Sequence, residues 1–250
     1  MVSDRFITMK EIENGLKEAG LLVGMSVEVH SSLSSFGDVL GGADTVIQAL
    51  INVVGEKGSI VMPSFLLSPF LPLTKEDREQ GITCKIRILP PDHNERSGMG
   101  VIADTFRKRS DVITGEGTFR VSAWGKEKEK NSQGFTNLIE NQGFCMLLGV
   151  DIYRFSSMHY MEDHLPDDIK RRFQPSDNVR AIYPEQEWFV ETWNPPVQAW
   201  YKIQEEAYKR GCIKDTMIGS CKCMSFRIKD VTDIYKEALI RDAYGLYGLA

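Results

Sequence analysis

The chain has 250 residues, of which 42% are hydrophobic and 26% are charged, and its formal net charge is -5. These values suit one globular domain with a substantial core. The mild acidity argues against a protein that binds nucleic acid through a basic face. No apolar run approaches the roughly 20 residues that a membrane-spanning helix needs.

The N-terminal residues and the cysteines indicate the compartment. The first ten residues lack the apolar core of a signal peptide. Five cysteines at irregular spacings predict no disulfide framework and fit a reducing environment. We therefore expect a single cytoplasmic domain over 1–250, with neither a nucleic-acid nor a membrane partner.

The N-terminal half shows clear helix and strand signals. Thr8 with Glu11 has the pattern of a capping box, and the helix that follows is expected to close at Gly20. Apolar spacing predicts a well-buried helix from Asp44 to Gly55. Short apolar runs predict strands over 26–30, 59–62, 121–124, 145–150 and 222–228.

The remaining segments complete the pattern. Four prolines make 66–96 an irregular excursion, either a lid or a substrate loop. Ser97 is expected to cap a helix, and 179–183 with 187–192 to form a β-hairpin. Further helices are predicted over 157–164 and 231–242, and Glu205 to Arg210 is expected to end another helix. Strands that alternate with helices indicate the α/β class.

A serine-rich segment marks the first candidate site. His30, Ser31, Ser32 and Leu33 stand where a predicted strand runs into a loop, ahead of a helix N-terminus. Ligands of open α/β sheets bind at the carboxyl ends of strands, and free amide groups there can hold a pyrophosphate. The same composition also suits a turn whose hydroxyls bond their own backbone.

The second candidate site follows the strand that ends near Val150. His159 and Glu162 are three residues apart and would share one face of a helix. A carboxylate beside an imidazole orients it and favours its protonated form, which suits a general base. A solvated surface pair is the alternative.

Other kinds of site have weaker signals. His159 and His164 are five residues apart, not the four of a zinc-protease helix. Cys221 and Cys223 lack the usual CxxC spacing. We therefore expect no metal. No GxSxG nucleophile elbow occurs in the chain.

An ordered series of short motifs resembles the aminoglycoside 3-N-acetyltransferase family over roughly residues 5–245. The motifs are Val29–Gly37 (VHSSLSSFG), Gly41–Ala43, Val61–Phe65 (VMPSF), Ser97–Gly100 (SGMG), Val121–Gly125 (VSAWG), Leu147–Val150 (LLGV) and Ser156–His159 with Glu162. The resemblance implies a layered α/β/α fold, distinct from the GNAT superfamily, that binds acetyl-CoA as cosubstrate. It also implies antibiotic resistance as a role and leaves a homodimer open.

The resemblance assigns roles to residues of both candidate sites. It implies that the CoA pyrophosphate lies against Ser31, Ser32 and Leu33, next to His30. Ser97, Met99 and Gly100 would line the same groove. His159 would be the general base of direct acetyl transfer, with Glu162 as its orienting carboxylate.

The acceptor is less well defined. An aminoglycoside-like amine is expected, and the acidic residues Asp151, Glu162, Asp163, Asp167 and Asp168 could attract its ammonium groups. Where the family usually has His-Pro before the VSAWG motif, this chain instead has Arg120 and no His-Pro. Another amine or amino sugar therefore remains open as acceptor, as does a catalytically idle CoA-binding protein.

Overall fold

The computed structural model describes residues 6–193 and 195–249. Its centre is a seven-stranded sheet in the order β4-β5-β2-β1-β6-β9-β8. The strands are β1 Ser26–Ser31, β2 Ser59–Pro63, β4 Ile113–Thr114, β5 Val121–Gly125, β6 Phe144–Leu148, β8 Lys214–Ile218 and β9 Cys221–Arg227. β2, β1 and β6 are parallel, and the strands on both sides of them run antiparallel.

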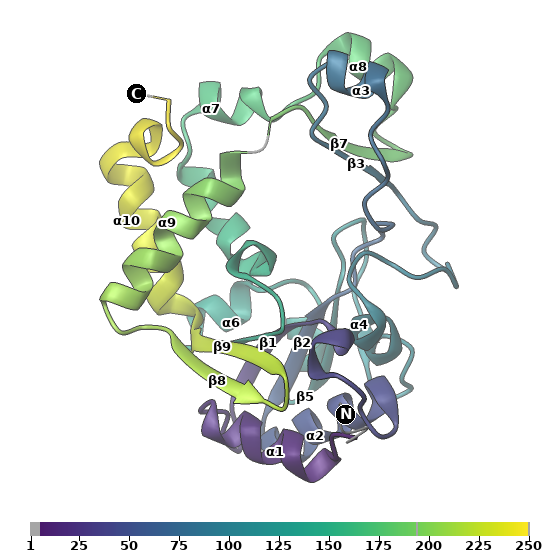
Figure 1. Ribbon diagram of the computed structural model, residues 1–250, viewed down its shortest axis with the longest axis vertical. Coiled ribbons are helices and arrows are strands. Elements are labelled where there is room, and N and C mark those ends of the chain that lie inside the picture. Colours follow the sequence, from purple (N-terminus) through teal and green to yellow (C-terminus); the bar gives the residue numbers. More distant parts are fainter. Residues whose placement is uncertain (1–5, 194, 250) are drawn as a thin grey trace, which may run out of the picture.

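Helices cover both faces of the sheet, which confirms the predicted α/β/α layering (Figure 1). One face packs against α1 Met9–Glu18, α2 Gly42–Val54 and α4 Val101–Phe106. The other packs against α6 Thr136–Glu140, η3 Ser156–His164, α9 Pro195–Lys209 and α10 Ile228–Leu246. Successive side chains of a strand point to opposite faces of the sheet, so Met146 of β6 packs in the first core and Leu147 in the second.

The first helix forms as its capping signature predicts. The amide of Glu11 donates to Oγ1 of Thr8 at 3.3 Å, and the amide of Thr8 donates to Oε2 of Glu11 at 3.0 Å. Ile12 and Leu16 are fully buried against the sheet. Two backbone N–H groups at the start of the helix thus have acceptors, and the apolar face of the helix packs against the sheet.

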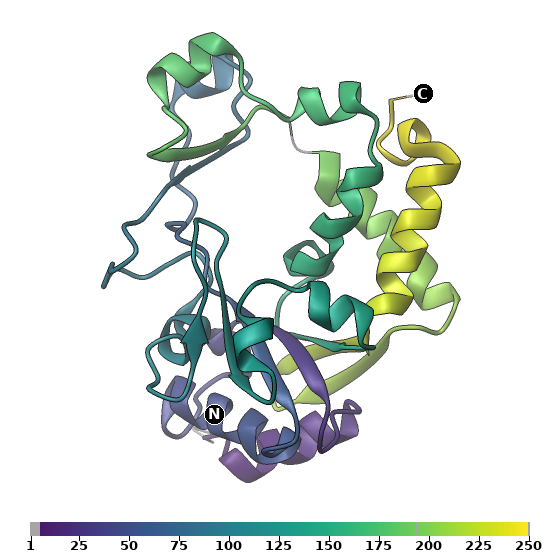
Figure 2. The same cartoon turned by 180° about the vertical axis from the view of Figure 1, so that it is seen from behind.

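A separate small lobe stands apart from the helical layer (Figure 1; seen from behind in Figure 2). This outer lobe consists of residues 66–96 and 174–193. It contains α3 Lys75–Glu79, β3 Cys84–Arg87, α8 Asp177–Ile182 and β7 Trp188–Glu191. β3 pairs with β7 in antiparallel register from Cys84–Glu191 to Arg87–Trp188.

Two predictions for this part of the chain are wrong. Residues 179–183 form no strand of a hairpin, because Ser176 caps helix α8 by accepting from the amide of Val179 at 3.4 Å. β7 finds its partner about a hundred residues earlier in the chain instead. The excursion over 66–96 is likewise partly regular, with α3 and β3 inside it.

The remaining short elements are η1 Leu33–Phe36, α5 Lys128–Asn131, η2 Ile152–Arg154 and α7 Asp167–Arg172. The predicted helix over 157–164 is a 3-10 helix, η3. Strand β8 was not predicted, although Gly219 and Ser220 mark the turn that joins it to β9. No helix in the described residues is both long and apolar enough to cross a membrane.

Candidate active site

The loops after β1 and β6 meet at one edge of the sheet, because these strands are parallel neighbours and Ser31 pairs with Leu148. A cleft of about 1510 Å³ opens there, between these loops, the outer lobe and helix α9. Ordinary small-molecule pockets occupy about 300–1,000 Å³, so this cleft has room for two substrates together. Its place at the carboxyl ends of parallel strands is where ligands of open α/β sheets bind.

The loop after β1 contributes His30, Ser31, Ser32 and Leu33 to the cleft wall. The amide of Ser32 donates to the carbonyl of Leu148 at 2.9 Å, which fixes the start of the loop against β6. Among the described residues, the amide of Leu33 has no backbone acceptor, so it remains available to a ligand. The hydroxyl of Ser35 behaves as in a self-bonded turn, since it donates to the carbonyl of Ser32 at 2.6 Å.

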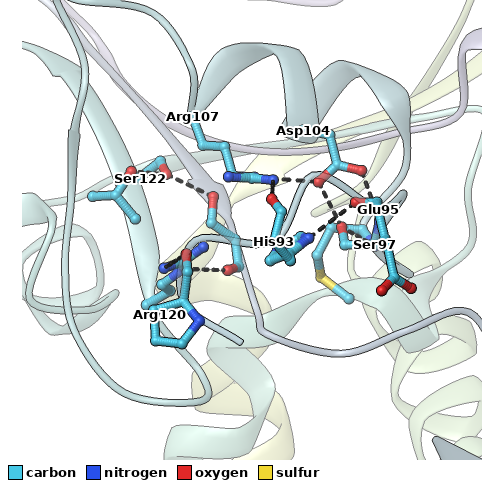
Figure 3. A network of polar contacts seen from close by, with 11 residues as sticks. His93, Glu95, Ser97, Asp104, Arg107, Arg120 and Ser122 are labelled. Carbon is cyan, nitrogen blue, oxygen red and sulfur yellow. Dashed lines mark hydrogen bonds and ion pairs between the residues drawn. The ribbon is translucent and has the colours of Figure 1, made fainter. Parts of the chain in front are cut away.

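The second predicted cofactor segment divides into two parts. Met99 and Gly100 line the cleft, whereas Ser97 is buried and does not. Ser97 instead donates from its hydroxyl and its amide to the two carboxylate oxygens of Asp104, both at 2.8 Å (Figure 3). The prediction that Ser97 caps a helix is wrong, because Gly100, with φ of 90°, is the N-cap of α4.

Asp104 connects this loop to the interior of the molecule. Its Oδ1 lies 3.4 Å from Nε of Arg107, which donates through Nη2 to the carbonyl of His93 at 3.0 Å (Figure 3). The amide of Met99 donates to the hydroxyl of Ser97 at 3.1 Å. Ser97 therefore acts on the cleft through the backbone of Met99, by holding the loop in shape.

The predicted base faces the cleft with one ring nitrogen held. Nδ1 of His159 lies 3.0 Å from Oε2 of Glu162, and the His159 side chain is 57% exposed. Its ring meets that of Trp200 edge-on, with centroids 4.8 Å apart. Glu162 thus binds Nδ1, which leaves Nε2 as the nitrogen that can exchange a proton in the cleft.

The charges around His159 favour its protonated form. Desolvation by the surrounding cleft walls lowers the pKa of His159, but the charge and hydrogen bond of Glu162 raise it, and the more distant Glu191 and Glu28 add to this. The net pKa lies above the usual value near 6.5. Glu191 lines the cleft, and burial raises the pKa of its carboxyl group in turn.

A buried carboxylate lies beneath the two candidate sites. Glu28 of β1 is fully buried, and its Oε1 lies 2.7 Å from Nε2 of His30. Its Oε2 accepts a short hydrogen bond from the hydroxyl of Ser157 in η3. The helix that carries His159 and the strand that carries Ser31 are therefore joined at one anion.

Comparison with known proteins identifies the family. A family model described as aminoglycoside 3-N-acetyltransferase matches residues 29–240. The chain belongs to this family. It is therefore an acyltransferase by family, with the fold and the cleft described above.

Individual known proteins are similar to this acyltransferase in sequence and in fold. The aminoglycoside N(3')-acetyltransferase-like protein YokD of Bacillus subtilis (strain 168) is 32% identical over 262 positions, covering 94% of this chain and 93% of YokD. Its crystal structure has a TM-score of 0.71 at 26% identity and covers 96% of this chain and 95% of YokD. AAC-IIIb, solved as a binary complex with CoASH, shares the fold with a TM-score of 0.68 at 18% identity, covering 95% of this chain and 97% of its own.

Not every polar residue expected near the acceptor lines the cleft of this acyltransferase. Asp151 does, whereas Glu162, Asp163, Asp167 and Asp168 do not. Arg120, expected as part of a wall near the active site, is also absent from the lining of the described cleft. It donates to the carbonyls of Ser64 at 3.1 Å and Pro91 at 2.9 Å, so its charge is directed at backbone.

Several cleft residues carried no recognisable sequence signal. Trp200 and Glu191 come from α9 and β7, far from the motifs. Arg154 lies between the LLGV motif and Ser156, in a stretch without a recognisable motif. Glu28 alone had a usable signal, because a carboxylate inside an otherwise apolar strand must be paired or hydrogen-bonded.

Proposed function

We propose that this acyltransferase transfers the acetyl group of acetyl-CoA to the amine of a small acceptor, directly and within one ternary complex. The observation that carries the proposal is the position of His159. Its imidazole is bonded to Glu162 at 3.0 Å and faces a cleft that Ser31, Leu33 and Gly100 also line. Base and proposed cofactor loop thus share one cavity large enough for both substrates.

CoA is assigned to the side of the loop after β1. The pyrophosphate would lie against Ser31, Ser32 and Leu33, where an amide without a backbone acceptor is available. Met99 and Gly100 would line the same groove. The binary complex of the fold neighbour AAC-IIIb with CoASH supports CoA as the acyl carrier.

The chemistry requires one proton to move twice. Nε2 of His159 accepts a proton from the acceptor amine as its nitrogen attacks the thioester carbonyl. The new C–N bond forms, the C–S bond breaks, and the proton passes to the leaving thiolate to give free CoA and the amide. The chain's own contribution is thus a positioned base and a preorganised loop.

His159→Ala tests the proposal. Turnover should fall by a factor of about 100 or more, the usual scale for loss of a general base, while CoA binding measured by calorimetry persists. His164→Ala is the matched control, because His164 lies on the same helix but outside the described cleft lining. A His159→Ala protein with wild-type turnover would refute the assignment of the base.

The first acceptor amines to assay are aminoglycosides, the substrates for which the family is named. Antibiotic resistance follows only if such a compound is acetylated at a useful rate. Wild-type protein that binds CoA but releases no free thiol with any amine would instead support an idle CoA-binding protein.

A further inference from the structure

The cleft has no excess of negative charge to attract a polycation. Three carboxylates and three basic side chains line it among the described residues, namely Asp38, Asp151, Glu191 and Arg96, Arg154, Lys222. Asp151 already accepts hydrogen bonds from the hydroxyl of Tyr201 at 3.0 Å and the amide of Ile152 at 2.9 Å. This balance gives a substrate with several ammonium groups little net electrostatic attraction to repay the hydration that it loses on binding.

Arg154 is a cation without an anion. Its guanidinium carbon lies 5.7 Å from the ring centroid of Phe70 and 5.0 Å from that of Tyr153. Within the described residues, its side chain makes no hydrogen bond and no ion pair. Cation–π contacts fix the plane of a guanidinium but leave its N–H donors free, so Arg154 presents a ready fork for a carboxylate or phosphate.

The other two basic residues of the cleft are placed differently. Lys222 is paired with Asp215 at 3.0 Å. Arg96 adjoins the loop of Met99 and Gly100, on the side assigned to CoA. Arg154 instead belongs to η2, five residues before His159, so their Cα atoms lie no more than about 18 Å apart.

An apolar wall, to which the outer lobe contributes Phe189, borders the same cavity. Phe65, Phe119 and Phe189 line the cleft and meet edge-on, with centroid distances of 5.4 and 5.9 Å. Phe119 is 55% exposed. Contact with an apolar or aromatic body removes the surface of such a cluster from water and is therefore favourable. The cluster offers no hydrogen bond to a polyhydroxylated sugar.

We infer that the acceptor is a primary amine that also carries an anionic group and an apolar body, with Arg154 binding the anion. This inference rests on the proposed acetyl transfer. The amine would lie near His159 and Glu191, the anion on the guanidinium of Arg154, and the apolar body against Phe119. Arg154 is then a residue that selects the acceptor, by charge-assisted and bidentate hydrogen bonds.

Three matched amines and one antibiotic test the inference. Phenylethylamine has no anion, and 4-(2-aminoethyl)benzoate adds a ring carboxylate. Phosphotyramine adds a phosphate, and a deoxystreptamine aminoglycoside is the polycation. Initial rates are followed by release of the CoA thiol, and binding to the CoA-loaded protein is followed by calorimetry. We expect kcat/KM for at least one anionic amine to exceed that for phenylethylamine by about tenfold or more, as loss of a charged hydrogen bond would give.

Variants of Arg154 decide the role of that residue. Arg154→Gln should reduce the preferred anionic amine to the level of phenylethylamine, without changing the CoA dissociation constant. Arg154→Lys should retain more activity with the phosphate than with the carboxylate, because a carboxylate profits from the bidentate fork. Arg171→Gln, on an exposed helix outside the described cleft lining, is the control for loss of one positive charge.

Three other outcomes would overturn the inference. If phenylethylamine or the aminoglycoside is preferred, the inference is wrong and the proposed transfer stands. If Arg154→Gln weakens CoA itself, Arg154 belongs to the cofactor site and the inference is wrong. If no amine is acetylated or bound while CoA binds, the proposed function fails and the inference fails with it.

Discussion

Nε2 of His30 lies 2.7 Å from the carboxylate of Glu28, two residues earlier on the same strand and fully buried. Residues two apart on a strand share a face, so both side chains point toward the helical layer that contains η3. The hydroxyl and the amide of Ser157 bond to the same carboxylate. One buried anion therefore fixes the orientation of His30 and the position of the helix that carries His159.

Glu28→Gln should destabilise the protein by about 1.5–3 kcal/mol, the value of hydrogen bonds to a charged group. The amide keeps one acceptor oxygen, but its NH2 group cannot accept the hydrogen bond that Ser157 donates to the other carboxylate oxygen. Urea unfolding monitored by circular dichroism measures the change. Glu140→Gln, at an exposed position of α6, is the control. Equal unfolding midpoints for Glu28→Gln and the wild type would show that the buried network does not hold η3.

Activity should rise with pH through a pKa above 6.5. A general base must be neutral, and the pKa of His159 is raised because the charge of Glu162 and its hydrogen bond outweigh the opposing effect of burial. Below that pKa the imidazole is protonated and cannot accept the amine proton. Glu162→Gln removes the raising charge, so the acidic limb of the profile should move to lower pH while the maximal rate falls. A limb that does not move in this variant would assign it to another group.

The sequence predicts the sheet better than the outer lobe, for physical reasons. Buried strands such as β6 are continuous apolar runs, and their neighbours follow from α/β topology. β7 pairs with β3 across about a hundred residues, and no local pattern encodes such a pairing. Ser176 begins α8 as an ordinary N-cap, a local signal that stands just before 179–183.

The sequence predicts those contacts of the candidate site whose two residues lie close together in the chain. His159 and Glu162 are close in sequence, so their contact follows from helical spacing. The family resemblance places Ser97 in the cofactor groove, whereas its side chain turns inward to Asp104, seven residues later. Arg154 and the aromatic ring of Phe70 come together only in the fold, since the two residues belong to different segments.

Gly149→Ala should weaken both folding and CoA binding. Gly149 follows β6 with φ of +69°, and a Cβ there would collide with the side chain of Ser35, in the loop assigned to the pyrophosphate. Gly211→Ala is a close control, because Gly211 has the same φ of +69° but open space around it. The control should lose about 1–2 kcal/mol of stability from backbone strain alone and retain the CoA dissociation constant. Equal CoA binding by the two variants would argue against a cofactor role for this loop.

The outer lobe depends on an ionic cluster that joins its two segments. Tyr183 donates to Oδ1 of Asp77 at 2.5 Å, Lys85 forms a short ion pair with Oδ2, and the amide of Thr74 donates to Oδ2 at 2.8 Å. Burial alone would raise the pKa of Asp77, but the hydrogen bonds of Lys85 and Tyr183 hold it at about 2. The stabilisation is therefore complete above the usual value of 3.8 and is lost as the pH falls through about 2.

Asp77→Asn should open this lobe at neutral pH, because it leaves the buried ammonium of Lys85 without its anion, a change that costs about 3–5 kcal/mol. The lobe's own core is small, with Ile82, Val179 and Val190 at its centre, so it should open locally before the sheet unfolds. Hydrogen exchange of the β3 and β7 amides measures this, with exposed Asp92→Asn as control. KM for the acceptor should rise, since Phe189 and Glu191 of the cleft lie on β7. Unchanged protection of β7 in Asp77→Asn would show that strand pairing alone holds the lobe.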